Sequence, residues 1–387
     1  MFDGEVAVVG HICLDVIPTF ITATRQALQP GALVQVGPVR FSPGGTVANV
    51  GLALHRLGCR PQLVSKIGDD HFGMTLLDLL RAYDTRLVEG MRVTPGETTS
   101  YSVVINPPGI DRTFLHCSGA NDRFGAEDVA AIDWAGVRVL HFGYPPLMAR
   151  IAANDGAELN TLLATAHTHG VTTSLDMAWP DPESAAGHID WSAFLRHCLP
   201  QVDLFMPSAE ELVFLLGDGT AGGQWSLTQL DALAERCLGM GAAIVAVKLG
   251  ERGLLLRTTD DAQRLRMAGA AVAAQAPRWR GRHLLAPCFA AKVAGTTGAG
   301  DATIAGFLLA LLADAEPIAA LTSAVAVGGC SVEAPDATSG IPRWETVQAR
   351  IAAGWPRLPL EDLAAEWQWE AALGIWHGPH DQRGAGI

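Results

Sequence analysis

AKVAGTTGAGDATIAGFLLA, residues Ala291–Ala310, is the stretch that decides how this chain folds. It predicts a short strand end, a glycine turn over Thr296–Gly300, and an apolar helix that begins near Asp301. Such a turn leaves the first N–H groups of the helix unpaired, and together with the helix dipole they favour an anion. Asp301 can support the helix start, or it can accept a proton from an attacking hydroxyl. The stretch therefore predicts an anion site beside a candidate base.

Strand and helix patterns alternate along most of the remaining chain. Val6–Gly10 is an apolar run that ends in glycine, which is typical of a strand buried on both faces of a parallel sheet. Further strands are expected at residues 62–67, 137–142, 172–176, 202–206, 243–249 and 254–256, and helices at residues 76–80, 158–169, 210–216, 227–238 and 319–332. This alternation predicts βαβ units and a mostly parallel sheet with helices on both faces.

The bulk properties narrow the class of protein. The chain has 387 residues, a hydrophobic share of 49% that allows a sizeable core, and a formal net charge of −13. That charge makes nucleic acid and anionic membranes poor partners, so a phosphate site has to be a local feature. The 7 cysteines are scattered without a CxxC pair, which argues against a disulfide framework. With no basic leader and no run of about 18 apolar residues, we expect a cytoplasmic protein without a membrane span.

Other polar and glycine positions follow predicted strand ends near the N-terminus. Asp15 follows the first strand, where it can hydrogen-bond a substrate hydroxyl or, equally well on position alone, be a solvated turn aspartate. Gly44 and Gly45 form a second glycine turn that feeds a helix ended by Gly58. Asn49 lies in the first turns of that helix and can point at a ligand over the two glycines.

Residues 98–116 predict a hairpin inserted between βα units. The two β-rich runs are joined by Asn106-Pro107-Pro108-Gly109, a turn sequence. The hairpin either covers a site and excludes water from a group transfer, or it is a simple edge embellishment. Arg112 in the returning strand can meet an anionic substrate group or be a solvated arginine.

Several better-known phosphate and metal motifs are absent from the sequence. There is no GxxxxGK[ST] motif, and the stretch Gly298–Thr303 lacks the third glycine of a dinucleotide fingerprint. The protein-kinase signature set is missing as well. His167 and His169 are two residues apart on a predicted helix, and the other histidines are scattered, so metal-dependent hydrolysis is disfavoured.

Two longer stretches carry a family resemblance. GTTGAGDATIAGF (Gly295–Phe307) is similar to the second signature of the ribokinase-like carbohydrate kinases, also called the PfkB family, and GGTVANVGLALHRLG (Gly44–Gly58) matches the first. The resemblance extends over roughly residues 5 to 345, in the order of the family, through VVGHICLD, KIGDDHFG, the hairpin, PSAEE and KLGERG.

The resemblance implies a three-layer α/β/α fold with a mostly parallel central sheet and a small β lid. It implies a kinase domain over residues 1–355, with the lid drawn from parts of 12–45 and 96–120, and a partly disordered tail over 356–387. In the family the hairpin forms part of the lid, and in some members it is a dimer surface, which implies a homodimer here.

The resemblance also implies roles for individual residues. Asp301 would be the catalytic base, and the turn of Gly298, Ala299 and Gly300 would stabilise the transferring γ-phosphoryl group of ATP. The residues implied to bind substrate hydroxyls are Asp15, Gly44, Gly45 and Asn49. Those implied to border the nucleotide are Ser208, Lys248, Gly250, Gly253 and Thr297. Glu211 is implied to organise Mg²⁺ and phosphate.

Three positions depart from the family pattern. Gly295 stands where the family usually has an aspartate associated with a monovalent-cation site, so potassium activation stays open. Ser208 replaces the asparagine of an N-x-x-E motif but leaves Glu211 in place. Lys248 stands where a threonine is frequent, and it either adds a phosphate contact or is a solvated lysine.

The sequence thus predicts an ATP- and Mg²⁺-dependent kinase that phosphorylates a primary hydroxyl of a sugar or sugar-like molecule. Two substrate alternatives stay open within the same fold. A nucleoside kinase would need a base pocket, for which Phe20, Phe114 and Tyr144 are candidates. A phosphosugar kinase would need Arg112 and Arg40 to converge on a second phosphate. From a different class, a regulator that binds sugar or nucleotide without turnover is the rival hypothesis.

Overall fold

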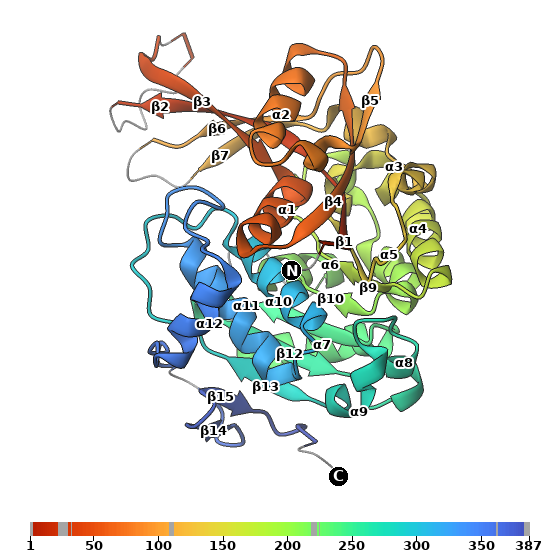
Figure 1. Ribbon diagram of the computed structural model, residues 1–387, viewed down its shortest axis with the longest axis vertical. Coiled ribbons are helices and arrows are strands. Elements are labelled where there is room, and N and C mark those ends of the chain that lie inside the picture. The colour runs from red at the N-terminus through yellow and green to blue at the C-terminus, as the bar shows by residue number, and fades with distance from the viewer. Residues whose placement is uncertain are drawn as a thin grey trace.

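The computed structural model describes residues 3–21, 30–31, 33–107, 112–217, 223, 225–360 and 363–382. Within these residues an eleven-stranded sheet runs through the molecule (Figure 1). Its strands, from edge to edge, are β14 (Gln368–Glu370), β15 (Ile375–His377), β13 (His283–Ala286), β12 (Leu254–Thr258), β11 (Ile244–Lys248), β10 (Leu204–Phe205), β9 (Thr172–Leu175), β8 (Val139–Gly143), β1 (Asp3–Gly10), β4 (Arg60–Gly68) and β5 (Gly90–Thr94). All neighbours from β11 to β5 pair in parallel, and the pairs from β11 to β14 are antiparallel.

Helices cover both faces of this sheet and form the outer layers. Side chains alternate along a strand, so β1 sends Val6 and Val8 into one core and Ala7 and Val9 into the other. The first core contains residues from α1 (Gly45–Leu57), α2 (His71–Arg81), α8 (Ala262–Arg266), α9 (Ala276–Trp279), α10 (Ala299–Leu312), α11 (Pro317–Ser331) and α12 (Trp344–Ala352). The second contains residues from α3 (Ala149–Ala152), α4 (Ala157–Thr168), α5 (Trp191–Cys198), α6 (Ala209–Leu216) and α7 (Leu227–Gly239). The predicted three-layer α/β/α fold with a mostly parallel sheet is confirmed.

A second sheet of four strands projects from one end of the molecule and forms the lid (Figure 1). Its strand order is β3 (Val36–Gly44), β2 (Cys13–Phe20), β6 (Tyr101–Ile105) and β7 (Thr113–Cys117). The antiparallel pair β6 and β7 is the predicted hairpin. Pro108 and Gly109 of its expected turn lie outside the described residues. The lid also includes β2 and β3, so two segments far apart in the sequence build one sheet.

The small residues of helix α11 allow it to pack closely against helix α10. A Cβ added at Gly306 of α10 would lie 2.9 Å from Val327 of α11, and one added at Gly328 would lie 2.5 Å from Oγ1 of Thr303. The contacts at these positions show that the small residues allow the two helices to approach closely. The close packing holds α10, and therefore its N-terminal turn, against the sheet.

The C-terminal region adds two strands to the sheet edge. β15 pairs with β13 through Leu285↔Trp376, and the Trp376 ring lies 5.2 Å from that of Trp369 on β14. The ring of Trp367 meets His283 edge-on at 4.7 Å. These tryptophans thus contact the domain itself. Residues 361–362 and 383–387 of the expected tail lie outside the described residues.

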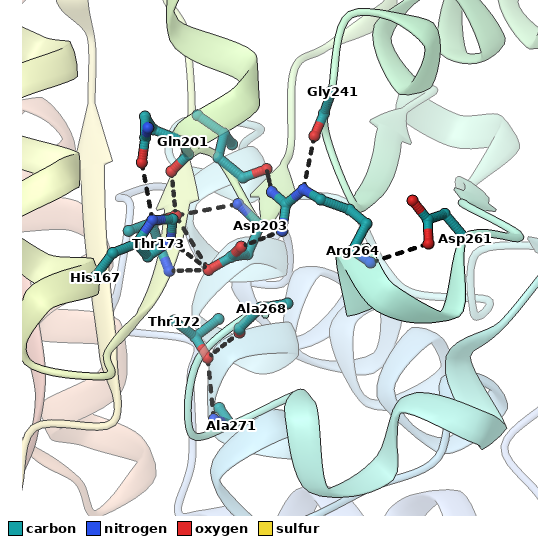
Figure 2. A network of polar contacts seen from close by, with 11 residues as sticks. His167, Thr172, Thr173, Gln201, Asp203, Gly241, Asp261, Arg264, Ala268 and Ala271 are labelled. Atoms are coloured by element: carbon teal, nitrogen blue, oxygen red, sulfur yellow. Dashed lines mark hydrogen bonds and ion pairs between the residues drawn. The ribbon is translucent and has the colours of Figure 1, made fainter. Parts of the chain in front are cut away.

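A buried polar network joins the amino ends of β9 and β10 (Figure 2). Asp203, with no exposed surface, accepts hydrogen bonds from Nη1 of Arg264 at 2.8 Å and from the backbone N–H of Thr173 at 2.9 Å. Its second oxygen also lies 3.0 Å from Nε2 of His167. Since both carboxylate oxygens are occupied, the buried charge is compensated.

Candidate functional site

The candidate site is built on the glycine turn that begins α10. Gly298 is the N-cap residue and has φ 70°, a left-handed conformation that favours glycine. A Cβ at Gly298 would lie only 2.5 Å from that of Ala337, so the loop after α11 also requires glycine there. No side chain caps the helix; the N–H of Ala299 donates to the Thr296 carbonyl at 3.3 Å, so the N–H groups of Gly300 and Asp301 are the ones that can meet an anion. A glycine turn is therefore present at the start of the helix, as the sequence predicts.

Asp301 lies in the first turn of α10 but does not cap the helix. Its carboxylate accepts a hydrogen bond from Nδ2 of Asn49 at 2.9 Å and from the Tyr144 hydroxyl, which lies 2.9 Å from each oxygen. Burial, followed by the nearby Asp176 charge, raises the pKa of Asp301 to about 6. A carboxyl with such a pKa is a stronger base than an ordinary aspartate while still ionised at neutral pH.

Tyr144 holds the base from the carboxyl end of β8. Its backbone has φ 65° and ψ 45°, which is strained for a bulky residue, and Pro145 follows it directly. The ring also lies over His11, with centroids 6.1 Å apart. The sequence offered Tyr144 only as part of a nucleoside base pocket. Its bond to Asp301 was missed, because it joins residues 157 positions apart.

Lys248 and two acids form a charged cluster beside this turn. Nζ of Lys248 binds Oδ1 of Asp176 at 2.6 Å, and the Lys248 side chain is only 12% exposed. Burial alone would lower the pKa of Lys248, but the Asp176 and Glu211 charges outweigh it and raise that pKa. A Cβ at Gly300 would lie 3.7 Å from Nζ, so the ammonium lies at the anion turn. The alternative of a solvated lysine is therefore wrong.

Burial raises the pKa of both acids in the cluster. The pKa of Glu211 rises to about 7, and that of Asp176 rises although Lys248 opposes the shift. Such unbalanced negative charge suits a cation ligand. Asp176 was missed in the sequence, although its place after the strand at 172–175 is the signal that singled out Asp15.

Ser208 and Glu211 also have a structural role. Ser208 is the N-cap of α6; its hydroxyl accepts a hydrogen bond from the Glu211 N–H at 3.2 Å, and its own N–H donates to Oε2 of Glu211 at 2.7 Å. This reciprocal pair is a capping box, which explains a serine at this position. Glu211 keeps one carboxylate oxygen outside that pair.

The predicted substrate residues lie together at the inner end of the lid. Gly44 begins α1, and a Cβ there would lie 2.5 Å from Oδ2 of Asp15. A Cβ at Gly45 would lie 2.6 Å from Nδ1 of His11, so both glycines are required by close approach. Burial raises the pKa of Asp15 to about 6, which favours the substrate role over a solvated turn aspartate.

A cavity of about 260 Å³ lies between the lid and the loop after α11. Its lining includes Asp15, Asn49, Thr297, Arg40, Arg112 and Phe114. Of the three aromatic residues proposed for a nucleoside pocket, only Phe114 lines it, since Phe20 pairs with Val36 at the far end of β2. The two arginines proposed for a second anion do share the cavity.

The remaining predicted residues flank this centre. Gly250 and Gly253 bound the short turn between β11 and β12, directly after Lys248. Gly253 has φ 104°, and a Cβ there would lie 1.9 Å from the carbonyl oxygen of Ala286. At Gly295 a Cβ would lie 3.0 Å from the backbone of Pro335, so the loop after α11 fills the space of an aspartate.

A larger cavity of about 630 Å³ lies at the opposite edge of the sheet, near the end of β12. Its arginines already have acidic partners: Arg257 binds Asp231 at 2.6 Å, and Arg282 binds Asp381 at 2.8 Å. It contains none of the predicted site residues, whereas Asp15, Asn49 and Thr297 line the smaller cavity.

The fold, lid and glycine turn together define a ribokinase-like α/β protein. The ribokinase of Arabidopsis thaliana, solved with ribose and ATP, superposes with a TM-score of 0.68 at 18% identity over 90% of this chain and 98% of its own. Among curated proteins, fructokinase-2 of Solanum habrochaites is 25% identical over 82% of this chain and 84% of its own length. The 2-dehydro-3-deoxygluconokinase of Bacillus subtilis is 24% identical over 84% and 90%.

Residues 3–344 match the family described as pfkB family carbohydrate kinase. The chain therefore belongs to the pfkB family of carbohydrate kinases, and the expectation of an ATP-dependent sugar kinase is confirmed at the level of the family. Within the described part of the chain, no helix is long and apolar enough to cross a bilayer.

Proposed function

We propose that the protein transfers the γ-phosphoryl group of ATP to a hydroxyl of a sugar or sugar-like substrate, with Asp301 as the base. The observation that carries this assignment is a buried carboxylate, with a pKa raised to about 6, beside the open N-terminus of α10. The substrate hydroxyl would donate its proton to Asp301 while the amides of Gly300 and Asp301 bind the developing phosphoryl charge. Asp15 and Asn49 would hold other hydroxyls and orient the attack.

Lys248 adds a fixed positive charge at the same turn. Its ammonium binds Asp176 and would also lie beside the phosphate oxygens of ATP. We therefore assign a phosphate contact to Lys248. Thr297, Gly250 and Gly253 would border the nucleotide, and Ser208 would act through the cap of α6.

Magnesium suits the acids of this cluster. Mg²⁺ is commonly bound by one or two carboxylates together with substrate phosphates, and Asp176 and Glu211 both carry poorly compensated charge. We propose these two as the groups that hold it. The described residues contain no group of three His, Cys, Asp or Glu side chains able to hold a metal alone. When bound, the ion would neutralise charge on the phosphates. The loop packed on Gly295 favours activity without potassium.

Sugar phosphorylation is favoured over the two rivals. The fructokinase and 2-dehydro-3-deoxygluconokinase relatives favour a sugar over a nucleoside, although the aromatic residues Phe41 and Tyr83 join Phe114 in the cavity wall. A regulator without turnover would not need a base held by both Asn49 and Tyr144. A homodimer through the lid and a cytoplasmic location stay predictions.

The test is ADP release from Mg-ATP with a panel of sugars, sugar acids, sugar phosphates and nucleosides. We expect release with at least one sugar-class compound, and none with nucleosides at equal concentration. Sugar binding by calorimetry without ADP release from any compound would favour the regulator instead.

A further inference from the structure

The cavity face of the lid is organised in rows across its four strands. Asp15 of β2 lies opposite Ser42 of β3 and beside Ser102 of β6, which in turn lies opposite His116 of β7. These four polar residues form the inner row. The next row toward the rim follows two residues further along each strand, since side chains on one face recur with period two. It consists of Arg40, Ile17, Val104 and Phe114.

Arg40 stands at a defined distance from the inner row. It lies opposite Ile17 on β3, two residues from Ser42, which corresponds to about 7 Å along the strand. The inner row reaches the base through Gly44 and Asn49 at the start of α1. A substrate whose reacting hydroxyl lies at Asp301 would therefore extend past Asp15 toward Arg40.

Arg112 lies one row further out, directly before the opposite edge strand β7. It is two residues from Phe114, so it shares the cavity face, and Nη2 donates a hydrogen bond to Oγ1 of Thr296 at 3.2 Å. Its guanidinium therefore crosses from the lid to the glycine turn. Arg40 on the edge strand β3 and Arg112 just before the other edge strand β7 thus both line one cavity.

The acids that line the cavity do not neutralise Arg40. Asp336 lines the cavity, but its Oδ1 accepts from the backbone N–H groups of Thr338 and Ser339 at 3.0 and 2.7 Å. Asp15 belongs to the inner row. Among the residues that the structure describes, none is found hydrogen-bonded to or ion-paired with Arg40.

We propose that the substrate carries an anionic group, a carboxylate or a phosphate, at the end remote from the phosphorylated hydroxyl, and that Arg40 and Arg112 bind it. This proposal rests on the kinase function proposed above. A guanidinium matches the geometry of both oxyanions through paired N–H donors. The apolar row of Ile17, Val104 and Phe114 would face the carbon skeleton between the two ends. In a chain of net charge −13, these arginines also offset the repulsion of an anionic substrate.

The first experiment compares matched neutral and anionic compounds on the wild-type protein. Glucose is paired with gluconate and glucose 6-phosphate, and fructose with fructose 1-phosphate and fructose 6-phosphate. We expect kcat/KM for the best anionic member to exceed that of its neutral partner by on the order of a hundredfold. Comparing acids with phosphates identifies which anion is bound.

Variants then assign the effect to the two arginines. Arg40→Gln and Arg112→Gln should each raise KM for the anionic substrate by on the order of tenfold or more, with little change in kcat or in KM for MgATP, because the contact is made equally in the ground and transition states. Arg92→Gln is the control, since Arg92 is an exposed arginine on β5 outside the cavity.

Three outcomes overturn the proposal while leaving the kinase intact. They are a preference for neutral sugars, an unchanged KM in both variants, and a rise confined to the KM of MgATP, which would assign the arginines to the nucleotide. If no compound releases ADP, the proposed function fails instead. Calorimetric binding then decides the present proposal: tighter binding of the anionic compounds that is lost in Arg40→Gln supports it, and equal binding of neutral and anionic compounds overturns it.

Discussion

Two buried aspartates flank the same pair of neighbouring strands and have opposite surroundings. Asp203 precedes β10, and its carboxylate binds Arg264, His167 and the backbone of Thr173 (Figure 2). Asp176 follows β9 and binds Lys248, with the acids Glu211 and Asp301 close by. Because the strands are parallel, the two aspartates lie at opposite edges of the sheet.

These surroundings indicate different roles: Asp203 stabilises the fold, and Asp176 belongs to the candidate active site. At the amino edge, every charge of the Asp203 network has a partner, so the network holds strands and α8 together. At the carboxyl edge, three acids share one ammonium, and burial raises the pKa of all three. Such an arrangement costs folding free energy, but it is the one that the proposed base and the proposed magnesium site require. The same isosteric substitution should therefore have opposite consequences at the two edges.

The largest effect is expected for Asp301→Asn. Removing the base should lower kcat by on the order of a hundredfold to ten-thousandfold while ATP binding persists. The melting temperature should stay unchanged or rise, because a buried carboxylate with an unfavourable charge becomes neutral. Steady-state kinetics, nucleotide titration and thermal melting measure the three quantities. Near-normal turnover in this variant would remove Asp301 from the role of base.

Asp203→Asn should have the opposite effects, a loss of stability with little change in turnover. The substitution leaves Arg264 without its charged partner in a buried place, which should lower the free energy of unfolding by about 3 kcal/mol. Turnover per folded molecule should stay close to wild type at low temperature. The control is Asp78→Asn, because the Asp78–Arg81 ion pair is exposed and should contribute less than about 1 kcal/mol. Urea unfolding of both variants distinguishes them, and equal midpoints would contradict the stabilising role.

Much of this contrast could be predicted from local sequence. The glycine turn, Asp301 and the alternating pattern identify the fold, because helix starts and strand periods are encoded within a few residues. Asp15 and Asn49 line one cavity, and Gly44 and Gly45 pack closely against Asp15 and His11.

Long-range partners could not be predicted. Tyr144 and Asp301 are 157 residues apart, and Lys248 and Asp176 are 72 apart, so only strand order brings them together. The same holds for Arg40 and Arg112, whose common cavity depends on the register of β2, β3, β6 and β7. Register is a tertiary property, and a shift of one residue would turn both arginines away.

Tyr144→Phe tests how the base is kept ionised among its acidic neighbours. The hydroxyl bond favours the charged form of Asp301, so losing it should raise the Asp301 pKa further above its value of about 6. The acid limb of kcat/KM should then move up by about one pH unit, with about a fivefold loss near pH 6 and near-normal activity at pH 8.

Two comparisons make that result specific. Tyr83→Phe is the control, because Tyr83 lines the cavity wall and should leave the pH profile unchanged. A carboxyl carbon NMR titration of Asp301 measures the same shift without turnover. If Tyr144→Phe lowered kcat equally at every pH, the hydroxyl would position Asp301 without setting its pKa.

The smallest effect concerns His167 at the amino edge. Burial lowers the pKa of His167, but the hydrogen bond and charge of Asp203 outweigh burial, so the folded pKa lies above 6.5. The folded protein therefore binds this proton more tightly than the unfolded chain does. The resulting stabilisation is fully present below about pH 6.5 and is lost as the pH rises through the folded pKa. We expect a loss below about 1 kcal/mol, since the ring is partly exposed.

Urea unfolding at several pH values measures this dependence of the unfolding free energy on pH. The slope should appear in wild type and in the control His169→Gln, which removes a ring stacked on Trp134. It should be absent in His167→Gln. An equal slope in His167→Gln would assign the pH dependence to the raised carboxyl pKa values of the opposite edge.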